Sequence, residues 1–161
     1  MIGAIAPSSR FLAKAVVEGL DLGSARAVLE YGPGTGAFTQ VVLKELSPGA
    51  KFAAIELNPR FAEAFRSRFP SVNLIEDSVA NVRGICARTG IQSVDCIVSG
   101  LPWAVFPESL QIDCLNATKS VLRPGGKFVT FSYVHSQALS ASKRFASLLP
   151  DRKSTRLNSS H

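Results

Sequence analysis

Short apolar runs alternate with amphipathic segments along most of this sequence. The apolar runs have the length and composition of buried strands and lie at residues 28–31, 51–57, 72–75, 93–98 and 127–133. The amphipathic segments carry apolar residues at helical spacing and lie at residues 7–20, 38–46, 58–69, 79–88, 108–122 and 139–149. This order predicts an α/β fold of the Rossmann-like, doubly wound type, in which helices cover both faces of a parallel sheet.

Local features modify three of these predicted elements. Gly84 is expected to interrupt the fourth helix, and the sequence RPGG at 123–126 predicts a turn that reverses the chain ahead of the fifth strand. The first helix, 7–20, packs on the core in one interpretation and lies on a membrane surface in the other, and the two are compatible.

A glycine-rich turn follows the first apolar run. The sequence VLEYGPGTGAFT at 28–39 places glycines at Gly32, Gly34 and Gly36 ahead of an amphipathic segment, which predicts a strand, a tight turn and a helix. Glycine permits positive φ angles and lets a ligand approach the backbone closely. The turn therefore opens a nucleotide-type binding site or, in the alternative, only allows close packing.

The residue ahead of the glycines bears on the choice of ligand. Read through Gly32, Gly34 and Ala37, the turn also fits a dinucleotide fingerprint, in which a pyrophosphate binds at the helix N-terminus. Glu30 would repel a pyrophosphate, but it suits a ligand that carries an ammonium and a sulfonium. S-adenosylmethionine is such a ligand, and its carboxylate can use the helix N-terminal amides that begin at Thr35.

Acidic residues also follow the second and third predicted strands. Glu56 ends the second strand twenty residues after Gly36, the distance at which a βαβ unit delivers a carboxylate to a ribose diol. A solvated strand-end glutamate is the alternative. Asp77 follows the third strand, where it can accept a hydrogen bond from the adenine amine or cap the next helix.

The loop after the fourth strand has the sequence SGLPW at 99–103. The fourth strand borders the crevice where the strand order reverses, so this loop is expected to face the reactive end of the cofactor. Trp103 can stack on a substrate or hold a cation against its ring. The alternative is a core or rim anchor.

Composition fits one globular domain of 161 residues that is 46% hydrophobic. No apolar run reaches the ~20 residues of a membrane-spanning helix, and the first residues lack the order of a secretory signal, so a cytoplasmic location is expected. The three cysteines, Cys86, Cys96 and Cys114, lack metal-ligand spacing. Reduced, packed thiols without a metal site or disulfide are therefore expected.

The last eleven residues, DRKSTRLNSSH, break in composition from the rest and have the character of a cloning scar. The expected domain is therefore residues 1–150, followed by a non-native-looking polar tail at 151–161. The tail carries +2 of the total net charge of +6, which leaves +4 on the domain. This mild excess is compatible with nucleic acid or an anionic membrane surface and establishes neither.

Taken together, these motifs resemble those of the class I S-adenosylmethionine-dependent methyltransferases over residues 3–149. The matching sequences are LEYGPGTG, IEL, EDS, SGLPW and LRPGGKF. Within that superfamily the chain is most similar to bacterial phospholipid N-methyltransferases, through its GAIAPSSRFLA start, its ELNPRF segment at 56–61 and its SGLPW loop followed by FP at 106–107. The ribosomal RNA adenine dimethyltransferases share the start and the glycine turn but carry an Asn-x-Pro-Tyr-like loop after the fourth strand.

The resemblance implies an enzyme that binds S-adenosylmethionine and methylates the headgroup amine of phosphatidylethanolamine towards phosphatidylcholine. It implies a monomer that associates peripherally with an anionic membrane surface, with nucleic acid a weaker candidate partner and no metal. The alternatives are an rRNA adenine N6-methyltransferase and a truncated, non-catalytic cofactor-binding domain. The residues expected to bind the cofactor are Glu30, Gly32, Gly34, Thr35, Gly36, Glu56, Leu57, Asp77, Ser78, Ser99, Gly100 and Leu101.

The implied reaction is a direct displacement in which the amine attacks the sulfonium methyl in line. Because an ammonium is not a nucleophile, the amine must first lose a proton. The candidate catalytic residues are Trp103, Tyr133 and His135, and the backbone carbonyls of Ser99 and Gly100 are further candidate proton acceptors.

The two ends of the chain differ from the pattern of the family. Family members continue past the fifth strand into a hairpin of two more strands, whereas the similar part here ends near Leu149. The expected fold therefore lacks the C-terminal β-hairpin, which would leave the fifth strand as an exposed edge. A membrane-binding segment ahead of Gly3, expected in the phospholipid enzymes, has little room. Both differences suggest a fragment.

Overall fold

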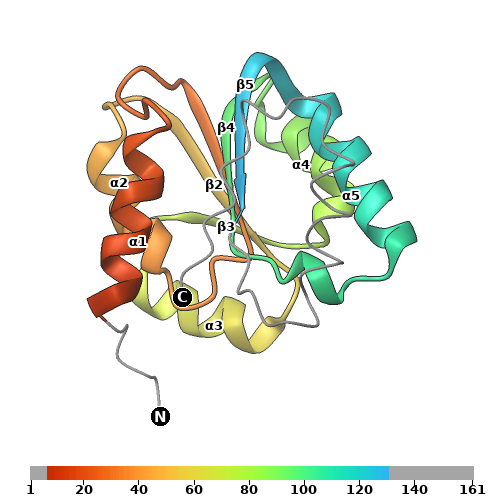
Figure 1. Ribbon diagram of the computed structural model, residues 1–161, viewed down its shortest axis with the longest axis horizontal. Helices are drawn as coiled ribbons and strands as arrows, with labels where there is room; N and C mark the ends of the chain where they lie inside the picture. Colours follow the sequence, from red (N-terminus) through yellow and green to blue (C-terminus); the bar gives the residue numbers. More distant parts are fainter. Residues whose placement is uncertain (1–6, 131–161) are drawn as a thin grey trace.

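A computed structural model describes residues 7–130 of the chain, with side chains from residue 10 onward. It contains one five-stranded sheet with the order β3-β2-β1-β4-β5, in which every neighbouring pair is parallel (Figure 1). The strands are β1 (Ala27–Tyr31), β2 (Lys51–Glu56), β3 (Asn73–Glu76), β4 (Val94–Ser99) and β5 (Leu122–Thr130). The predicted α/β, doubly wound parallel sheet is confirmed.

Helices cover both faces of this sheet. The α-helices are α1 (Pro7–Glu18), α2 (Ala37–Glu45), α3 (Pro59–Arg68), α4 (Val82–Thr89) and α5 (Glu108–Val121), and the short 3-10 turns are η1 (Val79–Asn81) and η2 (Trp103–Val105). In Figure 1, α1 and α2 lie on one side of the sheet, α4 and α5 lie on the other, and α3 runs across the lower end.

The central strand shows how the two layers are built. All five side chains of β1 are buried, as expected for a strand covered on both faces. Leu29 and Tyr31 pack in the core that contains residues of α4 and α5, whereas Val28 packs with α1 and α2. Each fully buried aliphatic side chain stabilises the fold by roughly 1.5–3 kcal/mol. Alternation along the strand places Glu30 on the same side as Val28, towards α2.

Most predicted boundaries agree with the structure within two residues, but the prediction at Gly84 was wrong. The helix α4 runs without interruption from Val82 to Thr89 through Gly84, and η1 precedes it. Glycine in a helix costs about 1 kcal/mol relative to alanine. The buried side chains of Val82, Ile85 and Cys86 compensate for that cost through packing.

The predicted separate turn at 123–126 was also wrong. The chain passes from α5 directly into β5, and the RPGG sequence forms an irregularity inside that strand. Leu122 pairs with Val94, and the next pair joins Lys127 to Cys96, so the intervening residues bulge out of the ladder. Gly125 supplies the positive φ of 75° that the bulge requires.

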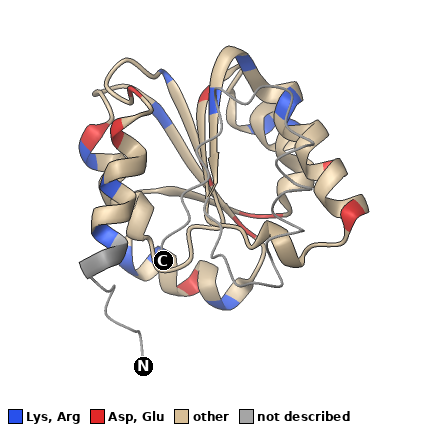
Figure 2. Cartoon of the chain, viewed as in Figure 1, with Lys and Arg blue, Asp and Glu red and all other residues tan. Residues whose placement is uncertain are grey.

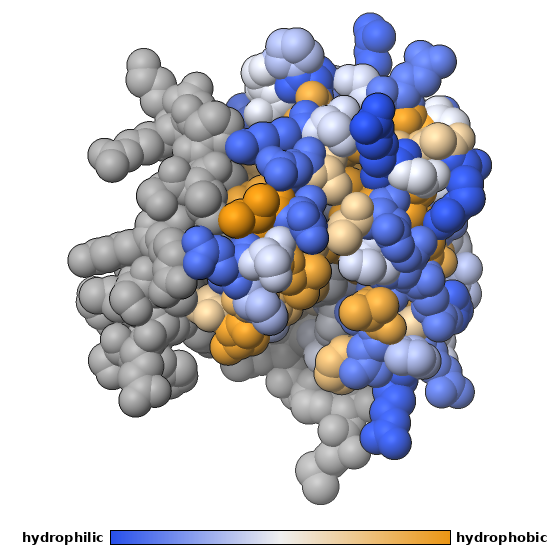
Figure 3. All heavy atoms as spheres, turned by 90° about the vertical axis from the view of Figure 1, so that its right-hand side faces the viewer, coloured by the Kyte–Doolittle hydropathy of each residue, from blue (hydrophilic) through white to orange (hydrophobic). Residues whose placement is uncertain are grey.

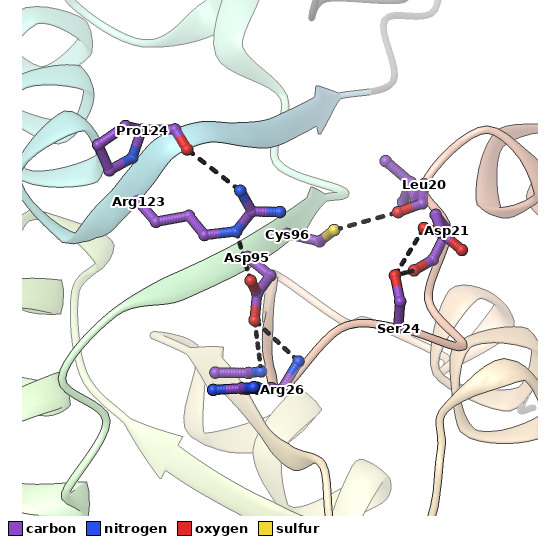
Figure 4. Close-up of polar contacts among 9 residues, drawn as sticks. Leu20, Asp21, Ser24, Arg26, Asp95, Cys96, Arg123 and Pro124 are labelled. Carbon is purple, nitrogen blue, oxygen red and sulfur yellow. Dashed lines mark hydrogen bonds and ion pairs between the residues drawn. The ribbon is translucent and has the colours of Figure 1, made fainter.

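The partly buried carboxylate of Asp95 stabilises this bulge at the amino-terminal ends of the strands. Asp95 of β4 accepts hydrogen bonds from the backbone N–H groups of Arg26 at 2.8 Å and Ala27 at 2.9 Å, and from the Arg123 guanidinium (Figure 4). Burial raises the pKa of Asp95, but the hydrogen bonds from Ala27, Arg26 and Arg123 outweigh it and hold the pKa below its ordinary value. One side chain therefore joins the beginnings of β1, β4 and β5.

The strand order defines where a ligand crevice lies. The chain builds β1, β2 and β3 outward in one direction and then crosses over to add β4 and β5 on the other side of β1. The order thus reverses between β1 and β4, and ligands of such sheets bind beyond the carboxyl ends of the strands at that point.

Several predictions concern residues outside the described range. The candidate catalytic residues Tyr133 and His135, the helix predicted at 139–149 and the tail at 151–161 all lie there, so they stay predictions. Within residues 7–130, none of the helices is long and apolar enough to cross a membrane, and no group of three acidic, histidine or cysteine side chains is placed to hold a metal ion.

Candidate cofactor site

The three glycines of the first turn serve different purposes. All three have left-handed backbone angles, with φ of 60° at Gly32, 53° at Gly34 and 79° at Gly36. A Cβ atom at Gly32 would lie 2.6 Å from Leu101 Cδ2, and one at Gly36 would lie 2.1 Å from Phe69 Cε2. A Cβ atom at Gly34 would meet nothing within 4 Å. Gly32 and Gly36 therefore allow close packing, whereas Gly34 presents open backbone at which a ligand can approach.

The C-terminal end of α3 holds the same turn from outside. The Arg68 guanidinium donates a hydrogen bond of 2.6 Å to the carbonyl of Thr35 and lies 5.3 Å from the centre of the Phe69 ring. The Phe69 ring in turn covers Gly36. The sequence predicted a helix over 58–69 but did not predict this contact of Phe69, and nothing local to Arg68 indicated its role.

Glu30 lies beneath the turn as a buried acid. Its side chain is 1% exposed, and Oε2 accepts a hydrogen bond of 2.6 Å from the Thr39 hydroxyl of α2. Burial raises the pKa of Glu30 to about 7, against the opposing effect of the Thr39 hydrogen bonds. The second oxygen, Oε1, is buried and has no hydrogen-bond partner among the described residues. A buried carboxylate oxygen without a partner fits a site that receives a positively charged ligand.

The loop after β4 lies directly against the glycine turn. The Gly100 N–H donates to the carbonyl of Tyr31 at 2.8 Å, and a Cβ atom at Gly100 would lie 2.8 Å from the carbonyl oxygen of Gly32. Ser99 is fully buried beside them. The structure therefore brings the two predicted loops together at the reversal point of the sheet, as their positions in the sequence predicted.

Trp103 occupies the second of its two predicted roles, that of a core anchor. The indole is 4% exposed, and its ring packs edge-on against Phe106 and Phe128 at centroid distances of 5.6 Å and 5.9 Å. Its Nε1–H donates a hydrogen bond of 2.9 Å to the Ser99 hydroxyl. The prediction that this ring stacks on a substrate or cation is corrected, because the surrounding aromatic side chains bury it.

Glu56 is buried at the end of β2, so the alternative of a solvated strand-end glutamate was wrong. It is 7% exposed, and its Oε1 accepts a hydrogen bond of 2.9 Å from the N–H of Asn58. The carbonyl of Glu56 accepts the N–H of Asp77 at 3.2 Å, which ties the ends of β2 and β3 together. Leu57, the next residue, is 69% exposed at the same edge.

Asp77 and Ser78 form the cap that was one of the two predicted roles. Asp77 Oδ1 accepts from the Ser78 N–H and the Asn81 amide, each at 2.7 Å, and Oδ2 accepts from Arg88 at 3.1 Å. The hydrogen bonds from Asn81, Arg88 and Ser78 hold the pKa of Asp77 below its ordinary value. The Ser78 hydroxyl accepts from the Ala80 N–H at 3.2 Å. Contact of this pair with an adenine ring stays a prediction.

All these groups lie at one edge of the sheet, and their chemistry fits S-adenosylmethionine. The acid beneath the turn matches a cation, the open backbone at Gly34 admits a ligand, and the buried Glu56 ends the neighbouring strand. Figure 2 shows acidic positions on the sheet in the centre of the fold, whereas most lysines and arginines lie on outer helices and loops. The site is therefore locally acidic in a basic chain.

Comparisons with known proteins agree with this arrangement. Residues 28–126 match the family described as a methyltransferase domain. An ornithine lipid N-methyltransferase from Singulisphaera acidiphila is 36% identical over 130 residues, which cover 79% of this chain and 68% of that protein. Ribosomal RNA small subunit methyltransferase A from Prosthecochloris aestuarii is 36% identical over 67 residues, which cover 42% of this chain and 24% of that protein.

Solved structures show the same fold at low sequence identity. An amino pentose methyltransferase from Micromonospora echinaspora, solved with bound S-adenosylmethionine, is 19% identical with a TM-score of 0.66, and the match covers 82% of this chain and 54% of that one. An O-methyltransferase from Bacillus cereus, in complex with S-adenosylhomocysteine, is 15% identical with a TM-score of 0.66. The match covers 90% of this chain and 70% of that one.

The family match contains the glycine turn, the acid before it and every loop of the site described above. It spans more than half of the chain, and the relative from Singulisphaera acidiphila extends the similarity beyond it. The chain therefore belongs to the S-adenosylmethionine-dependent methyltransferases.

Proposed function

We propose that this chain transfers methyl groups from S-adenosylmethionine to the amine of a membrane-lipid headgroup, and that phosphatidylethanolamine, on the way to phosphatidylcholine, is that lipid. The observation that carries the lipid substrate is the extent of similarity. It reaches over 130 residues for the lipid N-methyltransferase and over 67 for the rRNA methyltransferase. Association with an anionic membrane surface belongs to the same proposal.

The residues of the site have distinct roles in the proposal. Glu30 would hold positive charge on the cofactor, and the open backbone from Gly34 to Thr35 would approach its methionine part. Glu56 would accept hydrogen bonds from the ribose, and the strand end at Asp77 would lie along the adenine. When bound, S-adenosylmethionine supplies an electrophilic methyl group. The chain contributes mainly position, because it fixes these groups on rigid strand ends.

The loop 99–103 would receive the incoming amine. Trp103 keeps this loop in place through its hydrogen bond to Ser99 and its packing in the core, and so acts as a positioning residue. The amine must be uncharged to attack, since its lone pair forms the new bond to carbon. The carbonyls of Ser99 and Gly100, with Tyr133 and His135, are the candidates to accept its proton.

Radiolabelled methyl transfer to three substrates tests the proposal. The substrates are phosphatidylethanolamine vesicles, ornithine-lipid vesicles and an adenine-containing rRNA. We expect labelling of phosphatidylethanolamine above the other two. Labelling of ornithine lipid alone would support a lipid amine as the substrate but contradict phosphatidylethanolamine as the lipid. Labelling of RNA alone would favour the rRNA methyltransferase.

A matched variant and a binding assay complete the experiment. G34A places a methyl group in the open space in front of the turn, where it meets no other protein atom, so it is expected to block labelling of every substrate. Its left-handed backbone should cost roughly 1–2 kcal/mol of stability, and the circular dichroism of the folded chain should stay unchanged. S-adenosylhomocysteine should raise the melting temperature of the wild-type chain, and NAD should not. A chain that binds S-adenosylhomocysteine and labels nothing would favour the non-catalytic cofactor-binding domain.

A further inference from the structure

Three of the six large apolar side chains that are exposed among the described residues lie on three separate elements of the fold. Phe11 of α1 is 79% exposed, Phe61 of α3 is 55% exposed and Val105 of η2 is 75% exposed. Single apolar residues on a surface are normal and need no explanation. Their positions relative to the cofactor site decide whether they form a functional surface.

Phe61 and Val105 lie on either side of the strand ends that form that site. Phe61 lies in the first turn of α3, directly after β2, and Val105 lies in η2, directly after β4. Since β1 lies between β2 and β4, these two residues come from loops on opposite sides of the glycine turn. Figure 1 shows the first turn of α1, the helix α3 and the loop with η2 along the same lower side of the molecule. The helix α1, which carries Phe11 in its first half, therefore begins on this side as well.

Exposed cations accompany two of the three apolar residues. Arg10 and Lys14 are exposed on either side of Phe11 in α1, and Arg60 is exposed next to Phe61. Within residues 7–130 none of these three cations forms an ion pair. The cations at the other end of α3 are engaged internally, because Arg66 pairs with Glu76 and Arg68 binds the glycine turn.

The surface on the side of α4 and α5 differs from this edge. Figure 3 shows it as small apolar areas separated by hydrophilic residues. Ile112 of α5, which is 38% exposed, and Leu43 of α2, which is 40% exposed, are the large apolar side chains exposed elsewhere on helices. They provide matched controls for the residues at the edge of the site.

We infer that Phe11, Phe61 and Val105, with Arg10, Lys14 and Arg60, form a docking edge that binds an anionic lipid bilayer. Apolar side chains that enter the interface beside cations that contact lipid phosphates are the usual composition of such surfaces. Docking in this orientation presses the opening of the crevice against the headgroups, so that an amine reaches the site while its acyl chains stay in the bilayer. The inference rests on the proposed lipid substrate.

Vesicle cosedimentation with the full chain tests the docking edge. The vesicles contain phosphatidylcholine alone or phosphatidylcholine with phosphatidylglycerol, which supplies negative charge. The double variant F61S/V105S is expected to bind the anionic vesicles at least about tenfold more weakly than wild type, because two side chains lose their insertion. The control L43S/I112S should bind like wild type. Equal binding by F61S/V105S and wild type would overturn the inference.

Charge variants separate the two contributions. R10Q/R60Q is expected to weaken binding to anionic vesicles by about tenfold or more, at about fivefold for each cation, and to leave binding to pure phosphatidylcholine unchanged. Added salt should have less effect on this variant than on wild type. An equal loss on both vesicle types would contradict the role of charge at this edge.

Two further measurements keep this inference separate from the proposed function. If F61S/V105S loses vesicle binding but methylates detergent-dispersed phosphatidylethanolamine like wild type, both the docking edge and the lipid substrate are supported. If the variant loses vesicle binding and neither chain labels a lipid, the docking edge stands and the proposed substrate fails. Gel filtration tests whether the docking edge binds a second copy of this chain instead of a bilayer. A wild-type dimer that F61S/V105S converts to a monomer would overturn bilayer docking in favour of self-association.

Discussion

Replacing Glu30 by glutamine separates two effects of an acid buried beneath the glycine turn. Above about pH 7 the ionised carboxylate destabilises the protein without its ligand, because it lies in an apolar environment and Oε1 has no hydrogen-bond partner among the described residues. The same charge is what a cationic cofactor would bind. The variant E30Q is therefore expected to stabilise the empty protein at alkaline pH and to weaken its binding of S-adenosylmethionine.

The pKa gives the size and direction of the first effect. The pKa of Glu30 rises from 4.5 to about 7 on folding, so the folded chain holds this proton more tightly than the unfolded chain. The stabilisation by the proton is complete below pH 4.5 and declines as the pH rises, until it is lost above about pH 7. Between about pH 5 and about pH 8 the contribution to the free energy of unfolding falls by roughly 2.5 kcal/mol.

Urea unfolding of wild type and E30Q across this pH range measures the difference directly. Other titrating groups are shared by the two chains, so the pH dependence of the difference in free energy isolates Glu30. T39V provides a control that should change the pH dependence of stability in the opposite direction from E30Q. It removes the hydrogen bond to the carboxylate, which should raise the pKa of Glu30 further and steepen the loss of stability. Parallel stability curves for wild type and E30Q would refute the buried-acid reasoning.

Calorimetry with S-adenosylmethionine measures the second effect. A hydrogen bond to a charged partner contributes roughly 1.5–3 kcal/mol, so at about pH 8 E30Q should bind about tenfold to a hundredfold more weakly. Wild-type affinity should fall as the pH drops below about 7, because Glu30 gains a proton, whereas the affinity of E30Q should depend less on pH. A variant that loses stability and affinity together would point to a damaged fold instead.

Three further substitutions test other contacts. G36A should destabilise the fold by more than the roughly 1–2 kcal/mol of its left-handed backbone, since its Cβ would lie 2.1 Å from the ring of Phe69, and G36A/F69A should recover the part due to that clash in urea unfolding. D95N should lower the free energy of unfolding by roughly 1–3 kcal/mol near neutral pH. The pKa of Asp95 is lowered from its ordinary value of 3.8, so its stabilisation is present above pH 3.8 and is lost as the pH falls through the folded pKa. The difference between D95N and wild type should therefore disappear at acid pH. W103F keeps an aromatic ring in the core but removes the donor to Ser99, so kcat should fall while affinity for S-adenosylmethionine changes little, and an unchanged kcat would contradict the positioning role.

The parts of the site that were predictable from sequence depend on chain geometry. A strand, a glycine turn and a helix have fixed lengths, so the spacing from Gly36 to Glu56 is enough to place that acid at the end of the neighbouring strand. The acid before the turn, Glu30, was assigned to a cation from charge alone. The structure shows it buried next to Thr39, and its contact with a cofactor stays a prediction.

The parts that were not predictable depend on partners far away in the sequence. The indole of Trp103 is buried by Phe128, and the RPGG sequence becomes a bulge because Arg123 binds Asp95 on the adjacent strand. Local sequence does not contain these pairings. In the same way, Arg68 reaches Thr35 across 33 positions of the chain, and no periodicity marks such a contact in advance.

The Asp95 carboxylate ties three strands together at the end of the sheet that lies opposite the cofactor loops. The contacts of Asp95 thus fix the amino-terminal ends of these strands, and the loops at the carboxyl ends can vary without breaking those contacts. Exchange of the exposed Pro102 in the loop 99–103, with Trp103 kept, should therefore redirect the choice of acceptor while the melting temperature changes little. Protein engineering can treat the two ends of this sheet as separate modules.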